Sequence, residues 1–148
     1  MTAQPTVAGS CLCGAVRFSA ALPPKWVAHC HCSMCRRAHG AGFVTWVGLD
    51  RSAFTLEQGA DELARYRSSA QATRSFCSNC GSMLFFESGH WPGEIHVTLA
   101  SLDAAEGLEP QVHAYWSSRA AWADWNGKQL PTVDPPDHGP DQLGGRQA

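Results

Sequence analysis

The sequence predicts a single, mainly β domain, and three features support this. The chain has 148 residues, of which 44% are hydrophobic, which is enough for one well-packed core. Its 14 glycines and 9 prolines separate short segments rich in β-branched and aromatic residues, a composition typical of strands. Residues 94–99 alternate polar with aliphatic side chains, which places one face of a strand in the core.

The strands are expected to be short and to follow one another closely along the chain. We predict them at residues 15–20, 25–29, 42–48, 54–58, 63–68, 73–76, 83–87, 94–100 and 112–116. In the strand at 94–100, Ile95, Val97 and Leu99 should face the core, whereas His96 is expected at the surface.

One short helix is expected over residues 33–39. Ser33 can cap its N-terminus, and the residues that follow are good helix formers. Gly40 and Gly42 would then end the helix and turn the chain into the next strand.

The seven cysteines lie in three tight clusters: Cys11 and Cys13; Cys30, Cys32 and Cys35; and Cys77 and Cys80. Thiolates two or three residues apart can face one metal ion, and zinc takes four ligands in a tetrahedron. The two outer pairs together would form a closed site, which is typical of structural zinc. The central trio would leave one position open, as catalytic zinc sites do. We therefore expect two zinc ions per chain, the second more easily lost, with a different grouping of the ligands as the alternative.

Other readings of the cysteines are less favoured. A disulfide framework would belong to an oxidising compartment, but the first residues lack the basic and apolar regions of a secretory signal, and an odd number of cysteines would leave one unpaired. A thioredoxin-like site is disfavoured because neither Cys-x-x-Cys pair opens a helix within a βαβ unit. We expect a cytoplasmic protein with reduced thiols.

Charge and hydropathy exclude two classes of partner. The formal net charge is −2, and no run of basic residues is longer than Arg36-Arg37, so a nucleic-acid or membrane-surface partner is not expected. No apolar run approaches the ~20 residues that a membrane span needs. A small-molecule substrate fits this composition better.

The expected helix bears directly on the central trio. The first turn of a helix presents unpaired N–H groups and a partial positive charge, and both favour thiolate over thiol. If the helix begins at Ser33, its N-terminus points at the metal site and lowers the pKa of the trio.

Three segments of the sequence resemble one known family: GSCLCGAVRF at residues 9–18, CHCSMCRR at 30–37 and FCSNCGS at 76–82. Together with PQVH at 110–113, Trp122 and the Leu-Pro at 130–131, they resemble the glutathione-dependent formaldehyde-activating family, also met as the centromere protein V domain. The resemblance implies a domain over residues 8–134 with a β-rich, Mss4-like fold. The residues after it, 135–148, have little to bury and should form a disordered tail.

The resemblance also implies which cysteines hold which metal. Structural zinc would be held by Cys11, Cys13, Cys77 and Cys80, and a second zinc by Cys30, Cys32 and Cys35. The implied activity is a carbon–sulfur lyase reaction that joins formaldehyde to glutathione, with the trio as the catalytic residues. A non-catalytic zinc-binding module, or a carrier of glutathione and formaldehyde, is the alternative.

Two mechanisms are open for the trio. Zinc would deprotonate the glutathione thiol, which then attacks the aldehyde. In the other mechanism Cys35 leaves the metal and attacks, or forms a mixed disulfide with glutathione.

Arginines are the expected contacts for the carboxylates of glutathione. Arg36 and Arg37 adjoin the trio and are the candidates. The remaining strand arginines, Arg17, Arg65, Arg67 and Arg74, are expected on exposed faces.

The histidines and tryptophans give weaker signals. His29 and His31 flank Cys30 and should point away from it, because neighbours on an extended segment alternate. His113 lies within the resemblance, but nothing in the residues assigns it a role. Three tryptophans, Trp116, Trp122 and Trp125, are candidates for walls of the substrate pocket, with ordinary core packing as the alternative.

Overall fold

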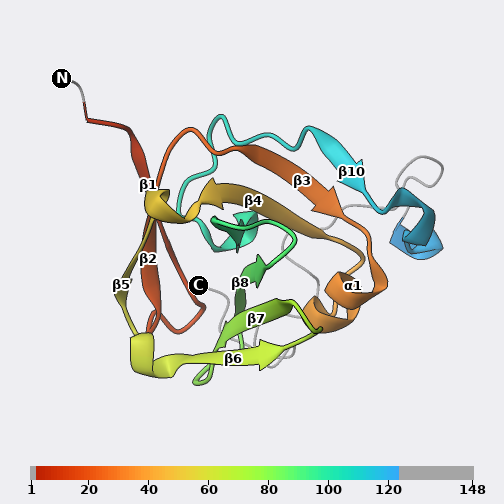
Figure 1. The fold of residues 1–148 in the computed structure, drawn as a ribbon, viewed down its shortest axis with the longest axis horizontal. Helices are drawn as coiled ribbons and strands as arrows, with labels where there is room; N and C mark the ends of the chain where they lie inside the picture. Colours follow the sequence, from red (N-terminus) through yellow and green to blue (C-terminus); the bar gives the residue numbers. More distant parts are fainter. Residues whose placement is uncertain (1–2, 124–148) are drawn as a thin grey trace, which may run out of the picture.

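The computed structural model describes residues 3–123, which form two sheets and one short α-helix (Figure 1). The smaller sheet has three antiparallel strands in the order β1-β2-β5: β1 (Thr6–Ser10), β2 (Arg17–Ala21) and β5 (Phe54–Gln58). The expected tail at 135–148, Trp125 and residues 130–131 lie outside the described residues.

The larger sheet has seven strands in the order β10-β3-β4-β9-β8-β7-β6. Its pairs are antiparallel apart from β10 with β3, which run parallel. The bounds are β3 (Trp26–Cys30), β4 (Val44–Asp50), β6 (Leu63–Arg67), β7 (Ala72–Cys77), β8 (Met83–Ser88), β9 (Glu94–Thr98) and β10 (Val112–Ala114).

The mainly β prediction is confirmed, and all nine expected strands occur within a few residues of their predicted bounds. The helix α1 (Ser33–His39) and the strand β5 coincide with their predictions. The predicted strand at 94–100 ends at Thr98, where a 3-10 turn at Leu99–Ser101 takes over. The strand β1 was not predicted.

The main core lies between the two sheets. Phe85 of β8 packs edge-on against Phe18 of β2 and Phe54 of β5, with ring centroids 4.9 Å apart in both pairs. Val47 and Val97, from β4 and β9, are fully buried on the same side of the larger sheet. This packing joins two sheets that share no strand.

The opposite face of the larger sheet is also buried, and it carries a row of aligned residues. The strand register sets Trp26 beside Gly48, Gly48 beside His96, His96 beside Phe86 and Phe86 beside Arg74. Gly48 is required here, because a Cβ at this position would collide with the indole of Trp26. Trp26 and Phe86 of this row pack with Trp46 and with Cys35 of α1 in a second buried cluster, separate from the main core.

None of the helices between residues 3 and 123 is long and apolar enough to span a lipid bilayer.

Candidate metal centres

The first centre, the four-cysteine cluster, joins the two sheets. Cys11 and Cys13 lie in the loop between β1 and β2, whereas Cys77 ends β7 and Cys80 lies in the turn to β8. The Sγ atoms of Cys11 and Cys13 are 3.6 Å apart, and those of Cys13 and Cys77 are 3.8 Å apart. Four sulfurs bonded at about 2.3 Å to one tetrahedral ion would be about 3.8 Å apart, which matches these two separations, and all four Sγ atoms lie within 4.8 Å of one another.

Local hydrogen bonds prepare this cluster to bind a cation. The Asn79 side-chain amide donates to Cys13 Sγ at 3.2 Å and lowers the pKa of that thiol. Burial opposes ionisation of Cys80, but hydrogen bonds from the Ser82 hydroxyl and backbone N–H lower its pKa to about 6. The sulfurs are free thiols in this structure, and the 3.6 Å and 3.8 Å separations are far from the ~2.05 Å of a disulfide.

The second centre, the cysteine trio, is built from consecutive residues at the start of α1. Cys30 ends β3, Cys35 lies in the first turn of α1, and the three Sγ atoms, including that of Cys32, lie within 4.8 Å of one another. The N-cap of the helix is Cys32 and not Ser33 as predicted, because the Cys32 sulfur accepts the Cys35 backbone N–H at 3.2 Å. The helix therefore begins on one of the three candidate ligands, and the Cys35 N–H of its first turn is donated to that sulfur.

The trio shares its protons unevenly. Hydrogen bonds from the thiols of Cys30 and Cys35 lower the pKa of Cys32 to about 2. The same interaction raises the pKa of Cys30. Cys32 is therefore the sulfur of this pair that ionises more readily, and a metal ion bound at the trio would displace the thiol protons.

Arg74 supplies a positive charge at the trio, contrary to the prediction that it is exposed. Its side chain is 4% exposed, and both terminal nitrogens donate toward Cys35 Sγ at 3.7 Å. The guanidinium also lies over the ring of Phe86, 5.1 Å from its centroid. The prediction failed because alternation along β7 shows only which side chains share a face of the strand. It does not show that residues distant in sequence cover the face that carries Arg74.

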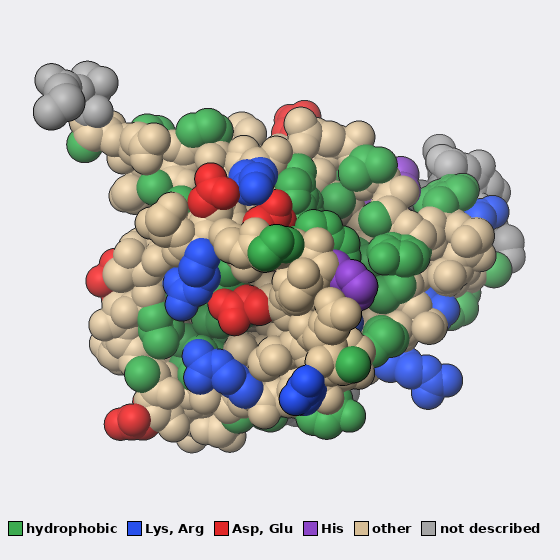
Figure 2. Space-filling view, viewed as in Figure 1, with side chains coloured by type: hydrophobic (Ala, Val, Ile, Leu, Met, Phe, Trp, Pro, Cys, Tyr) green, Lys and Arg blue, Asp and Glu red, His purple; other side chains and the backbone are tan. Residues whose placement is uncertain are grey.

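A cavity of about 370 Å³ opens beside the trio. All three cysteines contribute to its wall, together with Arg74 and side chains from β3, β4, β8, β9 and β10. Figure 2 shows hydrophobic side chains near a histidine that lies beside α1, while most charged side chains on this face lie elsewhere. The trio is thus open to a small molecule through a mostly apolar chamber.

His96 also lines this cavity and is buried, which corrects the prediction that it is a surface residue. Its Nε2 is 3.0 Å from the carboxylate of Glu94, which in turn pairs with Lys25 at 2.8 Å. Burial lowers the pKa of His96, so the ring is neutral at neutral pH. With Nε2–H donated to Glu94, Nδ1 is left as the acceptor.

Arg36 and Arg37, the predicted substrate contacts, do not line the cavity. The Arg36 guanidinium donates to the backbone carbonyls of His31 and Ser118, at 3.3 and 3.1 Å, and Arg37 is exposed on α1. Their role in substrate binding stays a prediction.

His29 and His31 point away from the trio as expected, and they meet His113 on the other side of the sheet. His31 Nε2 is 2.9 Å from His113 Nδ1, and His29 Nδ1 is 2.8 Å from the hydroxyl of Thr45. This group contacts no cysteine of the trio through the interactions described and packs instead as an aromatic cluster.

The tryptophans that wall the cavity are Trp26, Trp46 and Trp91. Of the predicted candidates, Trp116 packs on His31 and His113 and Trp122 is 77% exposed, so neither lines the cavity. The third candidate, Trp125, lies outside the described residues.

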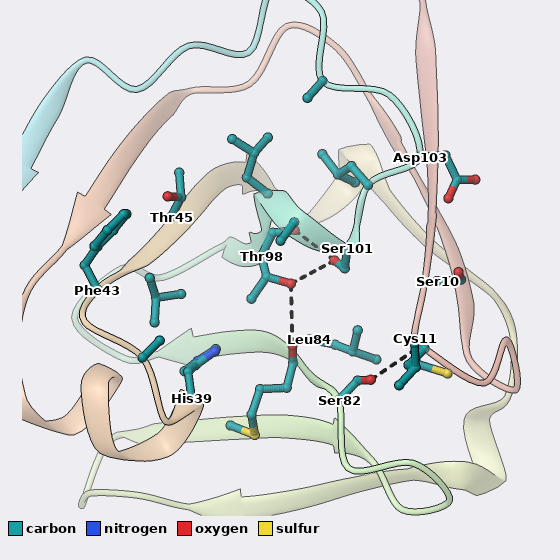
Figure 3. Close-up of a pocket in the computed structure, with 18 residues that line it drawn as sticks. Ser10, Cys11, His39, Phe43, Thr45, Ser82, Leu84, Thr98, Ser101 and Asp103 are labelled. Carbon is teal, nitrogen blue, oxygen red and sulfur yellow. Dashed lines mark hydrogen bonds between the residues drawn. The ribbon is translucent and has the colours of Figure 1, made fainter. Parts of the chain in front are cut away.

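A second and larger hollow, of about 900 Å³, runs from His39 to Cys11 (Figure 3). Its walls are mainly aliphatic, and two of its hydroxyls pair with each other's residue: Thr98 donates to the Ser101 hydroxyl, and Ser101 donates to the Thr98 carbonyl, both at 2.8 Å. It contacts no residue of the trio. The smaller cavity, where sulfur, guanidinium and imidazole converge, is therefore the better candidate for chemistry.

Comparison with known proteins identifies one family. The family model for the glutathione-dependent formaldehyde-activating enzyme matches residues 6–118. A Halomonas elongata protein named "Putative glutathione-dependent formaldehyde-activating enzyme" is 32% identical over 124 residues, which is 78% of this chain and 78% of that protein. A Schizosaccharomyces pombe protein named as an uncharacterized lyase is 32% identical over 88 residues, which is 56% of this chain and 58% of that protein.

A solved structure has a similar fold. The crystal structure of a Rhodobacter sphaeroides protein superposes with a TM-score of 0.60 at 28% sequence identity. The match covers 72% of this chain and 99% of the other.

Proposed function

The chain belongs to the glutathione-dependent formaldehyde-activating enzyme family, and from this we propose that it is a zinc-dependent carbon–sulfur lyase. Its reaction would form and break the adduct between a thiol such as glutathione and a small aldehyde. The observation that carries the proposal is the cysteine trio, which opens onto a cavity that also holds the buried guanidinium of Arg74.

Zinc would be held in two places. The four-cysteine cluster provides a complete tetrahedral set, and the trio provides three sulfur donors and leaves one position for a ligand from the cavity. When bound at the trio, zinc would stabilise a substrate thiolate at neutral pH.

Arg74 would serve the reaction by balancing charge. Three thiolates at one ion carry excess negative charge, and the guanidinium 3.7 Å from Cys35 Sγ offsets part of it. Because Arg74 also lines the cavity, it can donate to an aldehyde oxygen as negative charge develops there.

His96 would move the proton. Glu94 fixes the ring through Nε2, so Nδ1 can accept the proton of the adduct hydroxyl in the breaking direction and return it in the forming direction. The balance is simple: the thiol sulfur bonds to the carbonyl carbon, the carbonyl π electrons move to oxygen, and the thiol proton ends on that oxygen. No electrons are gained or lost.

Three further predictions belong to the proposal. Arg36 and Arg37 are kept as contacts for the glutathione carboxylates, outside the cavity. A reducing compartment such as the cytoplasm would keep all seven thiols available. Residues 8–134 would form the catalytic domain.

The deciding experiment is NMR exchange spectroscopy on equilibrated glutathione and formaldehyde, with the purified protein at substoichiometric amounts. An enzyme speeds the exchange between free and adduct forms without changing the equilibrium. A carrier shifts the equilibrium in proportion to its own concentration. Cys32→Ser should abolish acceleration, and exchange that is unaffected by the parent protein would refute the proposed activity.

A further inference from the structure

We propose that the cavity beside the trio selects an aldehyde that carries an apolar side chain of about the size of a benzyl group, in preference to formaldehyde. This inference rests on the proposed function and names the substrate class of the same site.

The cavity is much larger than formaldehyde. The cavity measures about 370 Å³, within the range of pockets that hold whole small-molecule ligands, about 300–1,000 Å³. Formaldehyde is a single carbon with no side chain, so it would leave nearly all of this space empty or filled with water. An aldehyde with a six- to eight-carbon apolar group would use the space.

Aromatic side chains form much of the cavity wall. Phe86 lies 6.0 Å from Trp46 and 6.1 Å from Trp91 between ring centroids, and Trp26 stands edge-on to His96 at 4.6 Å. These rings offer faces and edges to another flat apolar group. Small side chains leave the room between them: Ala28, Ala72 and Ala114 line the same cavity.

The cationic side chain of the cavity wall lies beside the trio. Arg74 is the only lysine or arginine among the residues that line the cavity in the described part of the chain, and it is held against Cys35. Ser68 adds a buried hydroxyl that has no hydrogen-bond partner among the described residues. A carbonyl or hydroxyl at the trio therefore has a guanidinium donor beside it, whereas the rest of the wall is mostly apolar, with hydroxyls and imidazoles as its other polar groups.

The apolar group must then come from the aldehyde and not from the thiol. Glutathione carries two carboxylates and an ammonium group, and burying these among aromatic rings without partners would be costly. Its charged ends fit better at the cavity mouth, where Met34, Val112 and Tyr115 are 46%, 56% and 59% exposed.

The reaction is unchanged in its balance. Glutathione sulfur bonds to the carbonyl carbon of the aldehyde, the carbonyl oxygen takes the proton released by the thiol, and the product is an S-(1-hydroxyalkyl) adduct. The lyase direction breaks the same carbon–sulfur bond and returns both reactants.

The test compares two aldehydes with glutathione as the common thiol. Exchange spectroscopy on equilibrated mixtures gives kcat/KM for phenylacetaldehyde and for formaldehyde with the parent protein. We expect phenylacetaldehyde to be favoured by about tenfold or more, the scale on which hydrophobic pockets discriminate. Equal values, or a preference for formaldehyde, would overturn the inference while leaving the proposed lyase intact.

Two variants locate the selectivity. Ala114→Leu reduces the volume of the cavity from β10, and Val112→Phe, at an exposed position, narrows its mouth with little risk to folding. Either should lower the phenylacetaldehyde to formaldehyde ratio by about tenfold. Ala41→Leu, which adds the same side chain to the larger hollow, is the control and should leave the ratio unchanged.

The outcomes separate cleanly. A ratio that is high in the parent, low in Val112→Phe and unchanged in Ala41→Leu supports the inference. A high ratio that neither cavity variant lowers would place selectivity elsewhere and overturn it. No accelerated exchange with any aldehyde, formaldehyde included, would refute the proposed lyase itself.

Discussion

The two cysteine centres use the same ligand in opposite ways. The four-cysteine cluster gathers residues from the β1–β2 loop and from the end of β7 and the turn after it, with Cys13 and Cys77 separated by 64 positions in sequence, so a bound metal would tie the two sheets together. The trio gathers its ligands from one short segment at the start of α1 and joins nothing distant.

Their surroundings differ just as clearly. The four-cysteine cluster offers four sulfurs, which would fill the coordination of a tetrahedral ion and leave no position for a substrate. The trio faces a cavity and has the cation of Arg74 beside it. Ligand number and connectivity, more than ligand type, separate a centre that stabilises from one that can react.

Removing one cysteine from each centre should give the largest difference between the two centres. Cys77→Ser removes a fully buried sulfur of the four-cysteine cluster and should cost about 4 kcal/mol or more in the free energy of unfolding, because structural zinc contributes directly to folding. Cys35→Ser should cost about 1–2 kcal/mol. Urea unfolding monitored by tryptophan fluorescence, with zinc per chain by elemental analysis, measures both; equal losses would remove the distinction.

Metal release should distinguish the centres by rate. A chromogenic chelator should take zinc from the trio at least about 100-fold faster than from the four-cysteine cluster, since the first is open and the second needs the sheets to separate. Absorbance at the chelator's band would follow two phases. Cys35→Ser should remove the fast phase alone, and a single phase in the parent protein would contradict the contrast.

Arg74 should matter to one centre only. Arg74→Met removes the charge beside Cys35 and should lower kcat/KM of adduct exchange by about 10- to 100-fold, the range for a group that stabilises developing charge. Arg74→Lys should recover part of it, because it restores charge without the two-pronged contact. Arg65→Met, on the exposed part of β6, is the matched control. Release of zinc from the four-cysteine cluster should not change.

Acid should lower the free energy of unfolding through protonation of His39. Burial, and then the charge of Arg74, lower the pKa of His39 from 6.5 to about 4. The folded state therefore binds this proton less readily than the unfolded state. The contribution of neutral His39 to the free energy of unfolding is fully present above pH 6.5 and is lost as the pH falls toward 4.

His39→Phe keeps the ring packed on Trp46 but cannot titrate. Between about pH 6.5 and 5 it should lose about 1 kcal/mol less stability than the parent, as measured by urea midpoints at both values. His90→Phe, at an exposed histidine, should behave like the parent. A loss that is the same in all three proteins would exclude His39 as the source.

The sequence patterns predicted the helix and the strands well because these elements depend on residues that are close together in the sequence. The extent of α1 follows from its helix formers and the glycine at its end, where Gly40 adopts a φ of 59°. The grouping of Cys11 and Cys13 with Cys77 and Cys80 agrees with the structure because the count of ligands permits few partitions.

The failures share a different cause. Alternation correctly placed Ile95 and Val97 in the core, but it cannot say what covers the other face, and so it missed the burial of His96 and Arg74. β1 was missed because Gly9 weakens its strand pattern; the glycine is there because a Cβ would collide with the ring of Phe18. The burial of Arg74 and His96 depends on residues far apart in sequence, such as Cys35 and Trp26.

The long separation between the ligands of the four-cysteine cluster also sets an order of events during synthesis. Domains form from the N-terminus as the chain emerges, so Cys11, Cys13 and the trio leave the ribosome well before Cys77 and Cys80. During that interval five thiols compete for metal without the partners that separate them in the folded protein. A metal ion bound in that interval would therefore have to be exchangeable for the two centres to separate, and excess metal should trap nascent chains with Cys11 or Cys13 bound to the trio.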